Sequence, residues 1–199
     1  MLLELKNASL SLDGRTLFSR LSLMAHSGQL TCISGVSGTG KTALLRVLMG
    51  FLPLDEGLVS IEGELLTPLS APAFRKLMAY LPQPEPPVGS TVKVRTRGLE
   101  TVWTAGFPSD DFSHSAPVLK DDDTSEPYAQ EDAPLPAVCE KALKRASIIL
   151  ADNPGLSLLS RLKALVAEGR IVVVASCREE FINMSDKTII LGNDDNHLR

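Results

Sequence analysis

The sequence has few cysteines, and those it has are far apart. Cys32, Cys139 and Cys177 are odd in number and show no C-x-x-C spacing, so neither a disulfide framework nor a zinc site is indicated. Long apolar runs are also missing, since no stretch approaches the eighteen or so apolar residues that a membrane span needs. Residues 1–6 lack the layout of a signal peptide. These absences predict a soluble, cytoplasmic protein with reduced, mostly buried thiols.

Clustered positive charge is another feature that the sequence lacks. The net charge is -4, and most of the acidic excess falls in residues 108–133, which hold eight acidic side chains and one lysine. Proteins that bind nucleic acid usually carry a basic stripe, so no nucleic-acid partner is expected. With 199 residues, 44% of them hydrophobic, the chain can bury one substantial core. We therefore expect a single domain over residues 1–199.

One motif organises the rest of the chain. Residues 35–42 form a complete G-x-x-x-x-G-K-[ST] loop, in which backbone N–H groups point at the β- and γ-phosphates of a nucleotide. Lys41 adds a positive charge, and the Thr42 hydroxyl can ligate Mg²⁺. The alternative is a glycine-rich turn that matches by accident. The predicted nucleotide-binding residues of this loop are Gly35, Val36, Ser37, Gly38, Thr39, Gly40, Lys41 and Thr42.

The segments around the loop favour the nucleotide site. Residues 30–34 are a short apolar run that suits a buried parallel strand, and residues 42–49 carry apolar side chains at helical spacing before Gly50. Strand, loop and helix therefore follow in the required order. The helix N-terminus would add its partial positive charge to the phosphate site.

The remaining periodicity predicts an α/β fold. An antiparallel hairpin or meander is expected before the loop, and strands alternating with helices after it imply a mostly parallel sheet with right-handed crossovers. The fold class is thus a P-loop NTPase with an N-terminal antiparallel β subdomain. The expected later elements are helices over 137–145 and 156–168 and strands over 147–151, 171–175 and 188–191.

Residues 1–83 resemble the opening of the ATP-binding cassette (ABC) ATPases. A β-rich lead-in, a turn ending in Gly28-Gln29, a strand, the P-loop and a helix follow in the family's order. Residues 46–63 then resemble its helix exit and next strand, and residues 74–83 the strand that ends at its Q-loop glutamine. The resemblance implies ATP and Mg²⁺ as cofactors and a membrane permease as partner. It also implies a homo- or heterodimer at the cytoplasmic face of the membrane.

Two further residues gain a role from the resemblance. Gln83 is the only candidate for the Q-loop glutamine that reaches Mg²⁺ and the attacking water, and Asp152 stands at a strand end where the family has its Walker B aspartate. The predicted metal ligands are therefore Thr42, Gln83 and Asp152. Alternatively, Gln83 is a solvent-exposed glutamine in a loop made irregular by prolines. Asp152 could likewise cap the following helix, with Pro154 near its start.

The sequence changes character over residues 84–136. Most of the thirteen prolines and the acidic run lie there, a composition that buries little apolar surface. The length suits the family's helical subdomain, so we expect an inserted helical, acidic and Pro-rich subdomain that is shortened or partly disordered. Apolar side chains at helical spacing predict one helix within residues 92–107. The run Asp121–Asp123 predicts a solvated loop rather than a metal site, because no glycine turn or spaced ligands surround it.

The chain departs from the family at its catalytic positions. Asn153 stands where the family has the glutamate that polarises water, and Cys177 or a neighbour stands where it has the switch histidine. The glycine-rich signature is absent from residues 133–137, and residues 156–159 lack the family's dimer-contacting aspartate. No aromatic residue that could stack on adenine lies near residues 10–14. Because Asn153 and Cys177 occupy these places, no catalytic residue is assigned.

Three functions are compatible with this pattern. The first is an ATP-binding subunit that acts with a membrane permease in transport and hydrolyses ATP weakly. The second is a non-hydrolysing, nucleotide-binding regulatory or structural protein. A small P-loop kinase is a third, but the sequence offers no acceptor-binding arginine cluster and no lid. In this family the permease and its receptors select the transported substrate.

Overall fold

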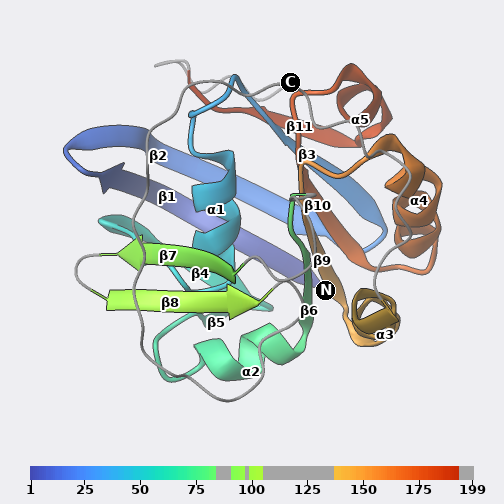
Figure 1. Cartoon of the computed structure of the whole chain (residues 1–199), viewed down its shortest axis with the longest axis horizontal. Coiled ribbons are helices and arrows are strands. Elements are labelled where there is room, and N and C mark those ends of the chain that lie inside the picture. The colour runs from blue at the N-terminus through green and yellow to red at the C-terminus, as the bar shows by residue number, and fades with distance from the viewer. Residues whose placement is uncertain (84–90, 97–98, 105–136, 193–199) are drawn as a thin grey trace.

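The computed structural model describes residues 1–83, 91–96, 99–104 and 137–192 of the chain (Figure 1). The acidic segment 108–133 and most of the predicted subdomain 84–136 therefore lie outside the described residues. No helix among the described residues is both long enough and apolar enough to span a bilayer.

The N-terminal part is an antiparallel sheet, which confirms the predicted hairpin. β1 and β2 pair antiparallel from Leu2↔His26 to Leu12↔Arg15. Alternating apolar side chains on both strands point to one face, where Leu3 and Leu5 are fully buried, as the period of two requires. The strands, in the order β2-β1-β4-β5, are β1 (Leu2–Leu12), β2 (Arg15–His26), β4 (Glu56–Ile61) and β5 (Glu64–Leu65).

The second sheet has five strands, and all their pairings are parallel. Its central strands are continuous apolar runs, because helices or the other sheet cover both faces. The predicted strand 171–175 is confirmed in full. The strands, in the order β11-β3-β10-β9-β6, are β3 (Gln29–Ser34), β6 (Met78–Leu81), β9 (Ile148–Asp152), β10 (Ile171–Ala175) and β11 (Lys187–Ile190).

The helices divide between the two faces of the parallel sheet (Figure 1). The predicted helix over 156–168 is observed as a 3-10 turn followed by a shorter helix. Part of the stretch 74–83, which was expected to be a strand, belongs instead to the helix α2 (Ala71–Lys76). The helical elements are α1 (Lys41–Leu48), α2 (Ala71–Lys76), α3 (Ala137–Arg145), η1 (Leu156–Leu158), α4 (Leu159–Ala167) and α5 (Glu179–Met184).

Two apolar cores hold these layers together. The first joins the antiparallel sheet, α1 and one face of the parallel sheet, with Leu44 of α1 and Leu150 of β9 in one cluster. The second joins the opposite face to α3, α4 and α5, with Ile149 of β9 in the same cluster as Leu162 and Phe181. Successive residues of β9 thus enter different cores, as alternation along a strand demands. The helix α1 is enclosed between two sheets, which places its N-terminus firmly.

The helix predicted within residues 92–107 is wrong where the structure describes that stretch. Two antiparallel strands occupy it instead, β7 (Thr91–Thr96) and β8 (Leu99–Thr104), paired from Thr91↔Thr104 to Thr96↔Leu99. Their sequences, TVKVRT and LETVWT, are rich in valine, threonine and tryptophan, which favour strands because β-branched and aromatic side chains suit a pleated surface. The spacing of a few apolar residues had favoured the helix over this composition.

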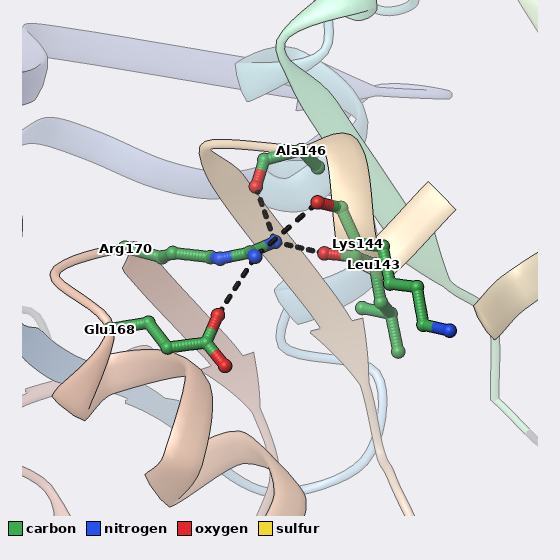
Figure 2. Close-up of polar contacts among 5 residues, drawn as sticks. All are labelled: Leu143, Lys144, Ala146, Glu168 and Arg170. Atoms are coloured by element: carbon green, nitrogen blue, oxygen red, sulfur yellow. Dashed lines mark hydrogen bonds and ion pairs between the residues drawn. The ribbon is translucent and has the colours of Figure 1, made fainter. Parts of the chain in front are cut away.

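The side chain of Arg170, between α4 and β10, forms hydrogen bonds with the C-terminal end of α3 (Figure 2). Its Nη1 donates to the carbonyl oxygens of Leu143 and Ala146, the latter at 2.9 Å, and its Nη2 donates to Lys144 O at 3.3 Å. Glu168 Oε2 lies 2.8 Å from Nη2. The last carbonyls of a helix have no partner within the helix, so the guanidinium satisfies those of Leu143 and Lys144. Its bond to Ala146, just beyond α3, also holds the chain that enters β9.

We expect Arg170→Lys to destabilise the protein by about 1–3 kcal/mol, because a lysine ammonium cannot reach three carbonyls with the geometry of the guanidinium. Thermal unfolding should show a melting temperature lower by roughly 2–12 °C. Glu168→Gln is the control: it removes only the ion pair, whose carboxylate side chain is 54% exposed, and should cost at most about 1 kcal/mol. Equal effects of the two substitutions would contradict this account.

Candidate nucleotide-binding site

The P-loop connects the end of β3 to the start of α1, as the sequence predicts. Two of its glycines are required by space as well as by conformation. A Cβ on Gly35 (φ 149°) would lie 2.6 Å from the carbonyl oxygen of Leu191 and 2.7 Å from Thr39 Oγ1. Gly40 has φ 92° at the N-cap of α1, a region that side-chain-bearing residues rarely enter. The loop can take this tight path only with glycine at both places.

The N-terminus of α1 is open to an anion. Its N-cap, Gly40, supplies no side-chain hydrogen bond, and no acidic residue lies in the first turn. The first N–H groups of a helix lack partners within the helix, and together with the helix dipole they attract phosphate. Lys41 Nζ donates to Gly35 O at 2.6 Å and to Val36 O at 2.7 Å. An ammonium has three N–H donors. Two of them therefore bond the loop, and one remains for a further acceptor.

Asp152, at the end of β9, is the buried acid of the site, with only 4% of its surface exposed. Burial raises the pKa of its carboxyl, and hydrogen bonds from Thr42 and Tyr80 together with the charges of Arg46 and Lys41 oppose that rise. The Tyr80 hydroxyl donates to Asp152 Oδ2 at 3.2 Å. An acid buried beside a P-loop threonine is a group that a metal ion would stabilise in its charged form.

The alternative role of Asp152 as a helix cap does not occur. The next helical elements begin at Leu156 and Leu159, and their N-caps are Gly155 and Leu158. The carboxyl of Asp152 is therefore directed to Thr42 and Tyr80, on neighbouring elements, rather than to its own following turn. This leaves its charge available to the phosphate loop.

The register of the parallel sheet brings the other predicted residues to the same edge. Asp152 pairs with Ala175, Ala175 with Ile33, and Leu81 with Ala151. The carboxyl ends of β3, β6, β9 and β10 are thus aligned, and ligands of open parallel sheets bind at that edge. The residues that follow these ends are the P-loop, Gln83, Asn153 and Cys177.

Each of the three residues beyond the P-loop has a distinct setting. Gln83 is exposed two residues after β6, so its role as a metal ligand remains a prediction. Asn153 is half-buried with φ 41°, a left-handed conformation that asparagine tolerates better than most side chains. Cys177 is an exposed free thiol, whereas Cys32 and Cys139 are buried. Burial raises the pKa of the Cys32 thiol to about 11, so Cys32 stays protonated.

Two other departures from the family pattern concern the base-stacking aromatic residue and the glycine-rich signature. Phe18, the only aromatic residue before the P-loop, is 7% exposed and belongs to the first core, so it cannot stack on a base. The glycine-poor stretch 133–137 lies outside the described residues, apart from the first residue of α3. Within the described part of the chain, no group of three or more His, Cys, Asp or Glu side chains could hold a metal ion. A metal here would depend on phosphate oxygens beside Asp152 and Thr42.

Sequence reasoning missed two residues of the site. Tyr80 was seen only as part of the strand before Gln83, although β6 lies next to β9 and its hydroxyl reaches Asp152. Arg15 was seen only as part of a turn, although its guanidinium lies beside the P-loop. Neither residue belongs to a motif. Tyr80 is brought to Asp152 by the pairing of β6 with β9, and Arg15 is brought to the P-loop by the packing of β2 against it, so no local signal could have found them.

The donor set fits a Mg²⁺-bound nucleotide. Open N–H groups and Lys41 suit the phosphates, and a carboxylate beside a hydroxyl supplies the hard oxygen ligands that Mg²⁺ prefers. A β-strand, a P-loop and a helix on a parallel sheet with helices on the far face define the class of P-loop NTPases of α/β fold.

Comparison with known proteins identifies the family. Residues 18–160 match the family model described as ABC transporter. The match covers more than half of the chain, and the protein belongs to the ABC transporter family.

Several curated proteins share part of the sequence. An Fe(3+) ions import ATP-binding protein of Pectobacterium atrosepticum is 39% identical over 84 residues, 41% of this chain and 24% of the relative. A cytochrome c biogenesis ATP-binding export protein of Hahella chejuensis is 41% identical over 80 residues, 40% of this chain and 37% of the relative. A probable ABC transporter ATP-binding/permease protein of Haemophilus influenzae is 24% identical over 96% of this chain and 38% of the relative. The chain thus matches between 24% and 38% of these relatives' lengths.

Solved structures share the fold. An ATP-binding subunit of an ABC transporter superimposes with a TM-score of 0.60 at 16% identity, over 96% of this chain and 86% of the other. A bacterial Atm1-family ABC exporter with ATP bound gives 0.64 at 17% identity, over 96% of this chain and 37% of the other. These likenesses confirm the predicted fold class.

We expect Asp152→Asn to stabilise the nucleotide-free protein at pH 7, because it removes a buried charge and keeps an oxygen that accepts hydrogen bonds. A folded-state pKa above the ordinary value near 3.8 means that the wild type loses stability as the pH rises through the raised pKa. Near pH 7, thermal unfolding should show a melting temperature about 2–4 °C higher, or roughly 1 kcal/mol. This gain in melting temperature of the Asp152→Asn protein should vanish below pH 4.

Asp13→Asn is the matched control for this experiment. Asp13 is exposed, and its positive φ of 49° suits asparagine. The same loss of charge at this exposed position should leave the melting temperature near pH 7 close to that of the wild type. A destabilised Asp152→Asn protein at pH 7 would show that the carboxylate contributes more through its contacts than it costs by its burial.

Proposed function

We propose that this chain binds Mg-ATP through the P-loop and acts as the ATP-binding subunit of a transporter. The observation that carries the proposal is the buried Asp152 carboxyl beside Thr42, at a loop where the N-terminus of α1 is open to phosphate and Lys41 keeps one N–H donor. In this proposal the side chains that would hold Mg²⁺ are Thr42, Gln83 and Asp152. A Mg²⁺ ion held there would neutralise negative charge on the phosphates.

The proposed partner is a membrane permease, which the chain would contact from the cytoplasmic side, as a homo- or heterodimer. Membership of the ABC transporter family supports this assignment. The relatives' names describe iron import and cytochrome c biogenesis export, which are different cargoes.

A second candidate is a nucleotide-binding regulatory or structural protein that does not hydrolyse ATP. Asn153 favours it, because a neutral amide can orient water but cannot take its proton. Cys177, at the place expected for the switch histidine, favours it too. The two candidates share the binding step and differ in turnover, so one test addresses each.

Binding is tested with Lys41→Ala. This substitution removes the charged donor of the loop, and a charge-assisted hydrogen bond is worth about 1.5–3 kcal/mol, so affinity for Mg-ATP should fall by roughly tenfold to a hundredfold. Calorimetric titration measures the change. Lys163→Ala, which removes an exposed lysine from α4 on the far face of the sheet, should bind as the wild type does. Equal affinity of the Lys41→Ala protein and the wild type would refute the nucleotide site.

We expect the wild-type chain to bind Mg-ATP but to hydrolyse it far more slowly than about 1 s⁻¹, the lower end of the usual enzyme range. A general base contributes about 10²–10⁴ in rate, and each oriented donor at the γ-phosphate about 10²–10³. These effects are not additive, but the loss of any one separates binding from turnover.

The matching gain-of-function test is Asn153→Glu. It should restore little turnover, because the histidine and signature positions still lack their groups. The left-handed φ of 41° at residue 153 also costs a glutamate about 1–2 kcal/mol. A steady-state phosphate-release assay at saturating Mg-ATP decides the matter. Wild-type turnover within the ordinary enzyme range would eliminate the non-hydrolysing candidate.

A further inference from the structure

The first residues of β2 lie against the P-loop, although some twenty residues separate the two segments in sequence. A Cβ built on Gly40 would come within 3.0 Å of Leu17 Cβ, and one built on Gly38 would lie 4.0 Å from Arg15 Nη1. Leu17 of β2 therefore packs against the loop through its apolar side chain. The guanidinium of Arg15, two positions earlier on the same face of the strand, also lies beside the loop.

The position of Arg15 is set by the backbone around it. Asp13 and Gly14 connect β1 to β2 with φ values of 49° and 79°, and Leu12 pairs directly with Arg15. Two central residues with positive φ are typical of the tight hairpin turns that leave little freedom in register. The contact of Leu17 with Gly40 then holds this end of the hairpin at the loop.

The charge of Arg15 is not neutralised by the part of the protein that the structure describes. Its side chain is exposed, and it forms no ion pair with any described residue. The ammonium of Lys41, by contrast, is engaged by two carbonyl oxygens of the loop. Arg15 thus adds a second positive charge, with several N–H donors, to the site where the phosphates are proposed to bind.

We propose that Arg15 is a further nucleotide-binding residue, whose guanidinium donates hydrogen bonds to phosphate oxygens held over Gly38. This inference rests on the proposed function of the P-loop. A guanidinium presents its donors as a planar fork that matches two phosphate oxygens at once. The contact is made from outside the loop, and it supplements the helix N-terminus and Lys41, which act from within it.

The experiment measures Mg-ATP affinity calorimetrically for the wild type, Arg15→Ala, Arg15→Gln and Arg15→Lys. Loss of a charged donor should weaken binding about tenfold in the first two variants, and Arg15→Lys should recover part of the loss because it restores the charge without the fork. Lys163→Ala is the control of equal charge. Thermal unfolding of each variant checks that the hairpin is intact, and Arg15→Gln keeps the test valid if alanine disturbs it.

Inorganic tripolyphosphate, measured in competition with Mg-ATP, separates a phosphate contact from a base contact. Arg15→Ala should weaken tripolyphosphate by the same factor as ATP. An unchanged tripolyphosphate affinity with weakened ATP would place Arg15 on the base and overturn the proposal. Unchanged ATP affinity in Arg15→Ala, with weakened binding in Lys41→Ala, would also overturn it while leaving the proposed function intact. A wild-type chain that binds neither ligand would remove both.

Discussion

The alignment of four parallel strand ends is the constraint on which the site depends. Because β3, β10, β9 and β6 pair in register, the P-loop and Asp152 leave the sheet at one edge, although more than a hundred residues separate them in sequence. Apolar side chains on both faces of the sheet hold this register, since a slip of one residue would exchange the two cores. The chemistry is thus positioned by the packing of residues that take no part in it.

The site also contains features that destabilise the nucleotide-free protein. Asp152 carries a carboxyl into a nearly closed environment, and the hydrogen bonds from Thr42 and Tyr80 oppose its desolvation only in part. Gly35 and Gly40 hold the backbone in conformations that few residues adopt. Such features are expected where a protein is arranged for a ligand rather than for its own stability. A bound metal ion and bound phosphates would compensate for this destabilisation, and the compensation would contribute to the free energy of binding.

Much of the fold could be predicted because its signals are local. The apolar run of β10, the helical spacing before Gly50 and the hairpin of β1 and β2 are each contained in a short window of sequence. The expected helix within 92–107 failed because a few apolar residues at helical spacing were preferred to β-branched composition. Likewise, part of the expected strand near Phe74 is helix α2, whose start at Ala71 and Pro72 has the proline that suits a first helical turn.

The sequence by itself determined the phosphate loop, its flanking strand and helix, and the absence of a carboxylate at residue 153 and of a histidine directly after β10, at residues 176–178. These properties reside in single residues or short motifs. Only the tertiary structure decided that Asp152 faces Thr42 and Tyr80 instead of capping a helix, and that Arg15 lies beside Gly38. Such contacts join segments that are distant along the chain, and they arise from sheet register and layer packing, which no local pattern specifies.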